Sequence, residues 1–463
     1  MTNPARLSAA ELLRRYATGA LTPTQAHDAV QAEIERREPV LNAFWVRDAS
    51  ASAAAAEQST KRWARGEPAG PLDGVPVTIK ENLARAGVPM PAGNAAVAPV
   101  LPERDSPVAA RLAATGAIIL GSTVMPDWGM LSSGVSSLHG ITRSPWNPDW
   151  TTGGSSSGAG AAAAAGFGPL HVGTDIGGSI RLPGTWLGLA TLKPTGGLIP
   201  LDAPYLGRAA GPMGRSADDL GLLLGVLAGP DRRDWTALPT VTEPTPAPSV
   251  AGLRVGVQRA AGAGMDVDAE VAAATDAAAA IFAAGGAELV DLAGFFTPEL
   301  LRRLDLFWRV RSLHDQRALP AERAERTLPF IQRWVAGGAG VDGLELMACY
   351  NAIIELQSRT IAATDGLDLI ISPVAPVAAF PAEWPMPFGD QDLGMAHIGF
   401  TAPYNMSGQP AGTINCGFTS DGRPIGLQVA GQRFADRAVL AALTWFENHR
   451  PATAEPHWPI GGS

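Results

Sequence analysis

Short apolar runs alternate with longer helix-like segments in the second half of the chain, and this alternation constrains the fold more than any other feature. The runs LRVGV (253–257), LDLIISPV (367–374) and IGLQVAG (425–431) predict strands. Between them, the alanine-rich segment 268–284 and the segment 343–364 predict helices. Strands that alternate with helices are typical of a sheet covered by helices, so we expect an α/β protein.

Composition divides the chain into four segments. Residues 1–66 carry apolar side chains at helical spacing. Residues 67–235 are rich in Gly, Ser, Thr and Pro between short apolar runs, and we expect the chemistry there. Residues 236–252 are rich in proline and predict an extended surface connection, after which residues 253–463 complete the alternating pattern. Length alone would allow about three domains.

The charge and the cysteines exclude several classes of protein. A net charge of −9 does not suit a nucleic-acid partner. We find no run of eighteen strongly apolar residues and no signal peptide, so no membrane partner is expected. Cys349 and Cys416 lie far apart without metal-ligand spacing, which fits free thiols in a reducing compartment. These features predict a cytoplasmic protein without a metal.

Lysine is scarce, and the positions it occupies are therefore informative. Only Lys61, Lys80 and Lys193 are lysines among the 35 basic residues. Arginine cannot lose its proton in a protein, whereas a buried lysine can act as a base. Lys80 lies at the end of the strand predicted within LDGVPVTIKEN (72–82), on the face opposite the valines and isoleucine. The competing interpretation is a solvated strand end, and Lys193, in ATLKPTGG (190–197), has a similar setting and serves as the control.

The segment TTGGSSSGAGAAAAAG (151–166) predicts a tight turn that leads into a helix. For Ser156 and Ser157 we accept the ordinary role of helix caps. Residues 154–158 match the nucleophile-elbow pattern G-x-S-x-G, and Gly158, Gly160 and Ala163 match a dinucleotide-binding pattern. Both motifs require a buried strand directly before them. The preceding RSPWNPDW is loop-like, so both are disfavoured.

The segment TDIGGS (174–179) predicts a site made from backbone. The consecutive N–H groups of Ile176, Gly177, Gly178 and Ser179 can converge on one point, because glycine permits the required dihedral angles. With a nucleophile beside it, such a cluster is an oxyanion hole, and Ser179 would be the nucleophile. A plain Gly-Gly turn capped by Ser179 is an equally good interpretation of this fragment alone.

A nucleophilic serine needs a base, which is usually histidine. His139 and His171 lie nearest in sequence, but neither belongs to a Gly/Ser motif. Lys80 is the better candidate if burial lowers its pKa from about 10.4 to near 7. Ser155 would then pass the proton between Lys80 and Ser179.

Taken in order, Lys80 after its strand, GGSSSG (153–158) and TDIGGSIR (174–181) resemble the amidase signature family of serine hydrolases. The two serines, Ser155 and Ser179, stand 24 residues apart, as in that family. Further similar blocks are LKPTGGLIP (192–200), GPMGRSADDL (211–220) and a C-terminal block that begins at FTAPYNMSGQPAG and ends at GQRFAD. The resemblance therefore covers nearly the whole chain.

The resemblance implies the amidase signature fold, a large mixed central β-sheet covered by helices on both faces, as one domain over residues 1–463. It implies a Ser–cis-Ser–Lys triad with Ser179 as nucleophile, Ser155 as the bridging serine after a cis peptide bond, and Lys80 as base. No metal or other cofactor is required. The oxyanion hole would be formed by the N–H groups of Ile176, Gly177, Gly178 and Ser179.

Supporting and pocket residues follow from the same comparison. Asp175 and Arg181 flank the site and are expected to brace the turn, with a surface ion pair as the alternative. The large side chains Trp128, Met130 and Trp186 suggest a pocket for apolar or aromatic groups, although each tryptophan is also a plausible core residue.

The expected function is that of a stand-alone serine amidohydrolase that cleaves a small-molecule amide to acid and amine, with anilides, esters and carbamates also open. The rivals are the A subunit of a tRNA-dependent amidotransferase and a non-catalytic scaffold. The former tends to carry SDTGGS, with a polar residue where this chain has Ile176. The sequence leaves the oligomeric state open, a homodimer included.

Overall fold

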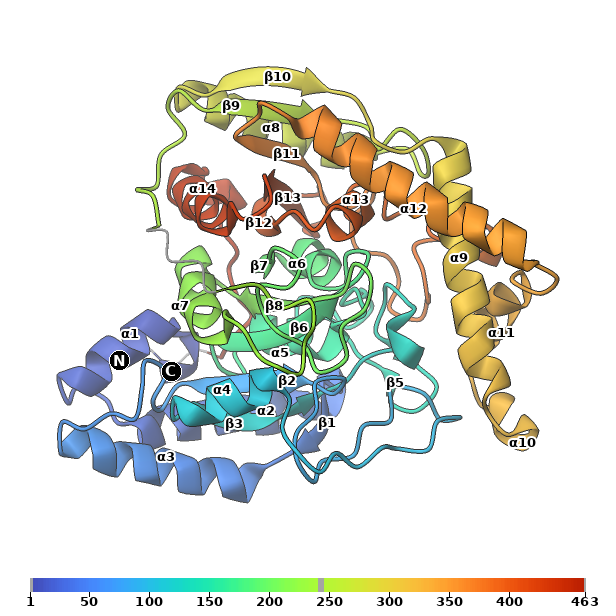
Figure 1. Ribbon diagram of the computed structural model, residues 1–463. Helices are drawn as coiled ribbons and strands as arrows, with labels where there is room; N and C mark the ends of the chain where they lie inside the picture. The colour runs from blue at the N-terminus through green and yellow to red at the C-terminus, as the bar shows by residue number, and fades with distance from the viewer. Residues whose placement is uncertain (1–2, 240–244, 462–463) are drawn as a thin grey trace.

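An eleven-stranded mixed sheet runs through the computed structural model, which describes residues 3–239 and 245–461 (Figure 1). Its strand order is β1-β3-β2-β6-β8-β7-β12-β13-β11-β9-β10, and β4 and β5 form a separate hairpin. The strands are β1 (Phe44–Arg47), β2 (Pro76–Lys80), β3 (Ile118–Thr123), β4 (Val135–Ser136), β5 (Gly140–Ile141), β6 (Leu170–Asp175), β7 (Ala190–Lys193), β8 (Ala209–Gly214), β9 (Arg254–Gln258), β10 (Glu288–Leu292), β11 (Leu369–Pro373), β12 (Ala411–Phe418) and β13 (Pro424–Gly431).

The described residues form fourteen α-helices and four short 3-10 helices. The α-helices are α1 (Ala9–Ala17), α2 (Pro23–Leu41), α3 (Ala49–Ala64), α4 (Pro107–Ala114), α5 (Ser157–Ala165), α6 (Arg181–Leu187), α7 (Ala217–Leu227), α8 (Ala269–Ala284), α9 (Pro298–Arg317), α10 (Ala321–Ala324), α11 (Pro329–Ala336), α12 (Gly343–Thr364), α13 (Ala402–Met406) and α14 (Asp436–His449). The 3-10 helices are η1 (Pro4–Arg6), η2 (Asp127–Gly129), η3 (Gln391–Leu393) and η4 (Ala452–Ala454).

Helices cover both faces of the sheet, as β11 illustrates. Its Ile371 packs into a cluster that includes Phe282 of α8 and Phe446 of α14. The neighbouring Ile370 belongs to a second cluster, which contains Trp186 of α6 and side chains of α9 and α12. Successive strand residues point to opposite faces, so the two clusters lie on the two sides of the sheet. The α/β architecture with a mixed sheet between helices is therefore confirmed.

The strands predicted in the second half of the chain appear as β9, β11 and β13, and the two predicted helices as α8 and α12. The N-terminal region differs from the expectation, because β1 interrupts its helices and pairs antiparallel with β3. Of the proline-rich connection 236–252, residues 240–244 lie outside the described residues. Among the helices of the described residues, none combines the length and the apolar character that a membrane span requires.

Small residues let α5 lie directly against the sheet, and this places its N-terminus at the candidate site. Every residue of α5 is buried. A Cβ atom on Gly158 would stand 2.3 Å from the carbonyl oxygen of Ala43 and 2.7 Å from the amide nitrogen of Val124. Any larger residue at Gly158 would push the helix away from the strands. The small residues of α5 therefore favour the helix and also allow it to pack closely against the strands.

Candidate active site

Strand β2 carries Lys80 into the interior of the protein. Both faces of β2 are buried, and the Lys80 side chain is 0% exposed, so the alternative of a solvated strand end is wrong. Lys80 Nζ donates hydrogen bonds to Ser155 Oγ at 2.9 Å and to Ser156 Oγ at 3.0 Å. The side chain thus ends at two hydroxyl groups at the start of α5.

Burial lowers the pKa of Lys80 from its ordinary value to about 7. The positive charge of Arg208 contributes to this lowering, while Asp175 and Glu81 oppose it. An amine with a pKa near neutrality is unprotonated in a large fraction of molecules at pH 7, so it can accept a proton.

The loop before α5 is held closely by the surrounding backbone. The Gly154–Ser155 peptide bond is cis, as the resemblance implies. A Cβ atom on Gly154 would lie 2.4 Å from the carbonyl oxygen of Ser133 and 2.6 Å from that of Leu131. Only glycine fits at this position, and the tight fit presents the Ser155 hydroxyl to Lys80.

Ser156 is not the helix cap that we expected. It occupies the N-cap position of α5 but makes no capping hydrogen bond with its side chain. Its hydroxyl instead accepts a hydrogen bond from Lys80 and donates to the carbonyl oxygen of Thr174 at 3.2 Å. Its backbone N–H donates to the carbonyl oxygen of Ser179 at 3.1 Å. Ser156 therefore ties the lysine, α5 and the Gly-Gly turn together.

The Gly-Gly turn offers three N–H groups rather than four. The Gly178 N–H donates to Asp175 Oδ1 at 2.8 Å and is not available to a ligand. The N–H groups of Ile176, Gly177 and Ser179 have no hydrogen-bond partner among the described residues. The φ angle of +130° at Gly178 is one that L-residues with side chains rarely adopt, which explains this glycine.

Asp175 and Arg181 form a buried brace behind this turn. Both side chains are 0% exposed, and Arg181 Nη2 lies 3.0 Å from Asp175 Oδ1, so the alternative of a surface ion pair is wrong. Asn405 Nδ2 also donates to Asp175. Arg181 Nη1 donates to the carbonyl oxygen of Thr401 and to Gln428 Oε1. Burial raises the pKa of Asp175, but the charge and hydrogen bonds of Arg181 outweigh it and hold that pKa below its usual range.

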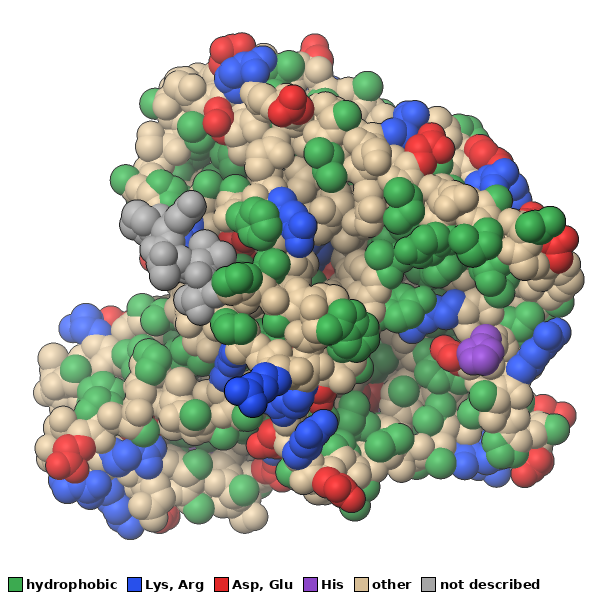
Figure 2. Space-filling view, in the orientation of Figure 1, with side chains coloured by type: hydrophobic (Ala, Val, Ile, Leu, Met, Phe, Trp, Pro, Cys, Tyr) green, Lys and Arg blue, Asp and Glu red, His purple; other side chains and the backbone are tan. Residues whose placement is uncertain are grey.

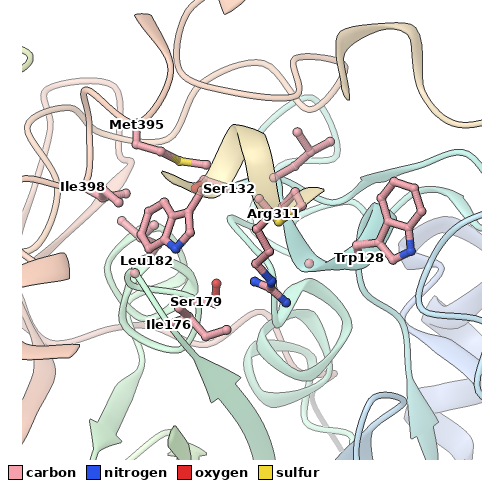
Figure 3. Close-up of a pocket in the computed structure, with 13 residues that line it drawn as sticks. Trp128, Ser132, Ile176, Ser179, Leu182, Arg311, Met395 and Ile398 are labelled. Carbon is pink, nitrogen blue, oxygen red and sulfur yellow. The ribbon is translucent and has the colours of Figure 1, made fainter. Parts of the chain in front are cut away.

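A narrow cavity of about 70 Å³ opens onto the turn, and Ser179, Ile176 and Gly177 line it (Figure 3). The predicted pocket residues Trp128 and Met130 also line it. Trp186 does not, so its expected place in the pocket is corrected: its side chain is fully buried and its ring packs edge-on against Phe380. Figure 2 shows this face of the molecule hollowed beside α9, with hydrophobic side chains bordering the hollow.

A second serine lines the same cavity. Ser132 Oγ lies 2.7 Å from His397 Nε2. Burial lowers the pKa of His397 to about 3, and its Nδ1 atom has no hydrogen-bond partner among the described residues. With this lowered pKa, and with no carboxylate bound to it among the described residues, the imidazole is a much weaker base than Lys80. The sequence motifs do not mark Ser132.

The histidines nearest in sequence lie elsewhere. His139 Nε2 is 3.0 Å from Glu81 Oε2, and His171 Nδ1 is 2.8 Å from Thr78 Oγ1. Within the described residues, neither imidazole has a hydrogen bond to Ser155 or Ser179. Nor does a hydrogen bond join the hydroxyls of these two serines.

Comparison with known proteins gives a consistent result. The amidase family matches residues 26–440. The chain belongs to the amidase family. This confirms the resemblance drawn from the motifs, and the protein is accordingly an enzyme of amide C–N bond hydrolysis.

Individual relatives cover almost the entire chain. The A subunit of glutamyl-tRNA(Gln) amidotransferase from Symbiobacterium thermophilum is 32% identical, with 97% of this chain and 99% of that protein aligned. The acylamidase of Rhodococcus erythropolis is also 32% identical, with 96% of each chain aligned. The crystal structure of a bacterial aryl acylamidase of the amidase signature family superposes with a TM-score of 0.89 at 25% identity and covers 99% of both chains.

Besides Ser132, the sequence analysis missed the roles of Ser156, Arg208 and Asn405. Ser156 was taken as a cap, Arg208 lies in none of the motifs, and Asn405 belongs to the block FTAPYNMSGQPAG, in which nothing indicates its contact with Asp175. Arg208 follows an unremarkable loop, yet its charge reaches Lys80. Asn405 stands 230 positions from the aspartate it contacts. Such contacts depend on the folding of distant segments onto one another, which local patterns do not report.

Proposed function

We propose that the protein is a stand-alone amidohydrolase in which Ser179 is the nucleophile, Ser155 the proton relay and Lys80 the base. One observation carries this proposal. The buried Lys80 Nζ lies 2.9 Å from Ser155 Oγ, and the backbone N–H of the adjacent Ser156 donates to the carbonyl oxygen of Ser179, which lines the cavity. A lysine with a lowered pKa beside a serine pair is suited to activating a hydroxyl nucleophile.

In the first step, Ser179 Oγ forms a bond to the carbonyl carbon of the amide. The Ser179 proton passes to Ser155, and the Ser155 proton passes to neutral Lys80. The link between the two serine hydroxyls forms when substrate binds, since catalytic hydrogen bonds often tighten only in the complex. The free N–H groups of Ile176, Gly177 and Ser179 stabilise the developing oxyanion.

The proton then returns through Ser155 to the amide nitrogen, the C–N bond breaks, and the amine leaves with the acyl group bound to Ser179. Water attacks this ester by the same route. Its proton passes through Ser155 to Lys80, the bond between the acyl carbon and Ser179 Oγ breaks, and the proton returns through Ser155 to Ser179 Oγ as the carboxylic acid leaves. The brace of Asp175 and Arg181 keeps the turn in place during both steps.

The cavity supports amides with an apolar or aromatic group. Most of its lining is apolar, including Trp128, Leu182 and Ile398. One relative is an acylamidase, and one structural neighbour is an aryl acylamidase. Anilides are therefore suitable first substrates. The relatives that are amidotransferase A subunits support a second candidate, a catalytic subunit that works within a complex.

Intact-mass measurement after treatment with a fluorophosphonate tests the proposal, together with assays of purified protein on a small anilide panel. We expect one adduct in the parent, no adduct in Ser179→Ala, and turnover without partners. Ser132→Ala is the matched control and should retain the adduct. If the adduct is lost in Ser132→Ala instead, our proposal names the wrong serine as nucleophile. An adduct without turnover would favour a catalytic subunit that needs its partners.

A further inference from the structure

Among the described residues, Arg311 is the one charged residue that lines the cavity of Ser179. The other lining residues have apolar side chains, are glycines, or are the serines Ser132 and Ser179. Arg311 belongs to α9, and Figure 3 shows its guanidinium inside the pocket on the side of Ser179. A guanidinium keeps its charge at all relevant pH values, so a permanent cation faces an otherwise apolar space.

Arg311 has no acidic side chain in contact with it among the described residues. It takes part in none of their ion pairs within 4.0 Å and in none of their hydrogen bonds. The contact that holds it is the ring of Tyr205, 4.2 Å from the guanidinium carbon. Stacking on a ring positions a guanidinium without using its N–H donors. All five donors of Arg311 therefore remain available to a ligand.

The neighbouring Arg208 shows the contrast. Its guanidinium donates to the carbonyl oxygens of Ala203 and Asn82, so much of its hydrogen-bonding capacity is used inside the protein. Burial lowers the pKa of Arg208, Asp202 opposes this change, and the charge of Arg311 lowers the pKa further. The two cations are thus close enough to repel each other, and an anion in the pocket would relieve that repulsion.

We propose that Arg311 forms a carboxylate-binding site within the substrate pocket, and that the substrates are amides carrying a carboxylate, such as half-amides of dicarboxylic acids. This inference rests on the proposed function of the pocket. The fork of a guanidinium pairs with a carboxylate through two parallel hydrogen bonds. The apolar walls, with Leu182 and Ile398, accommodate the methylene or aryl spacer between that carboxylate and the amide.

Matched substrates test the charge preference. We would measure kcat/KM for the mono-4-nitroanilides of glutaric and adipic acid against pentanoyl and hexanoyl 4-nitroanilide, and for N-acetyl-4-aminobenzoate against acetanilide. The parent should favour the carboxylate member of at least one pair by about 10-fold or more, mainly through KM. In Arg311→Gln the ratio within that pair should fall about 10- to 100-fold.

Two further variants separate charge from shape. Arg311→Lys keeps the charge but loses the fork, so its ratio should lie between those of the parent and Arg311→Gln. Arg317→Gln removes an equal charge from an exposed position on the same helix and should leave the ratio as in the parent. Equal ratios in the parent and Arg311→Gln for every pair would overturn the inference, even if amide hydrolysis itself is confirmed.

A binding measurement separates this inference from the proposed reaction. Calorimetry with glutarate on Ser179→Ala should detect binding, and the additional change Arg311→Gln should abolish it. If the anilides are not hydrolysed but glutarate binds in an Arg311-dependent manner, the reaction proposal fails and the carboxylate site stands. Absence of glutarate binding to Ser179→Ala counts against the site.

Discussion

The ends of β2 and β7 carry two lysines that are alike in burial and in pKa. Lys80 ends β2 and Lys193 ends β7, and both are buried. Burial lowers the pKa of each to about 7. Their contacts differ, because Lys80 meets two serine hydroxyls, whereas Lys193 Nζ donates to the carbonyl oxygen of Pro194 at 2.7 Å.

This difference teaches that a lowered pKa does not by itself make a catalytic base. A carbonyl oxygen has no proton to give, so Lys193 has nothing to activate. Lys80 has the exchangeable protons of two serine hydroxyls beside it, and the backbone N–H of one of them, Ser156, donates to the carbonyl oxygen of Ser179. The neighbours of each amine therefore distinguish the two, and the following experiments test that view.

The largest effect is expected from Lys80→Met. The variant lacks the proposed base, so kcat on an anilide should fall about 10³- to 10⁴-fold. Lys193→Met is the matched control, and its kcat should stay within about 3-fold of the parent. Equal losses in steady-state assays of the two variants would refute the contrast drawn here.

The two serine partners of Lys80 should differ as well. Ser155→Ala interrupts the proposed relay and should reduce kcat about 10²- to 10³-fold. Ser156→Ala removes a positioning contact and should cost about 10-fold, with an unchanged fluorophosphonate adduct on Ser179. A larger loss in Ser156→Ala would move the relay to that hydroxyl, and near-parent activity in Ser155→Ala would exclude it from the route.

The pH dependence gives a smaller, directional effect. Since the base must be neutral, kcat/KM should rise with pH through an apparent pKa of about 7. The charge of Arg208 lowers the pKa of Lys80, so Arg208→Gln should shift the rising limb to higher pH and reduce activity at pH 7. Profiles of kcat/KM between pH 5 and 9 test this prediction. A shift of the rising limb to lower pH in Arg208→Gln would contradict our assignment of Lys80 as the base.

The smallest effect concerns stability and uses Lys193 alone. The pKa of Lys193 is lower in the folded than in the unfolded chain, so its protonated form destabilises the fold. This cost is complete below the folded pKa and decreases as the pH rises toward the unfolded pKa of about 10.4. Arg181 and Arg433 add to the lowering of the Lys193 pKa, and Asp175 and Asp436 oppose it. Lys193→Met should therefore raise the Tm by about 3 °C at pH 6 and by less at pH 9. Differential scanning calorimetry at pH 6 and pH 9 measures this difference in Tm. A larger rise in Tm at pH 9 than at pH 6 would contradict the prediction.

Sequence patterns predicted β9, β11, β13, α8 and α12 in the second half of the chain, because each of these patterns reflects a local period of apolar residues. The same patterns failed at β1, a short edge strand that lies between two strong helices. Trp186 was misplaced for a related reason. A large aromatic residue near a site motif does not reveal whether it faces the cavity or, as here, packs on Phe380 in the core.

The sequence by itself determined the family, the α/β class, and the lysine and serines to examine, since these depend on residue identity and spacing. Only the tertiary structure decided what surrounds each of them. Burial on both faces of β2 lowers the pKa of Lys80, and chain segments far apart in sequence bring Asn405 to Asp175 and Arg311 to the pocket of Ser179. Solvation and long-range contacts arise only when the chain folds, and a linear pattern does not contain them.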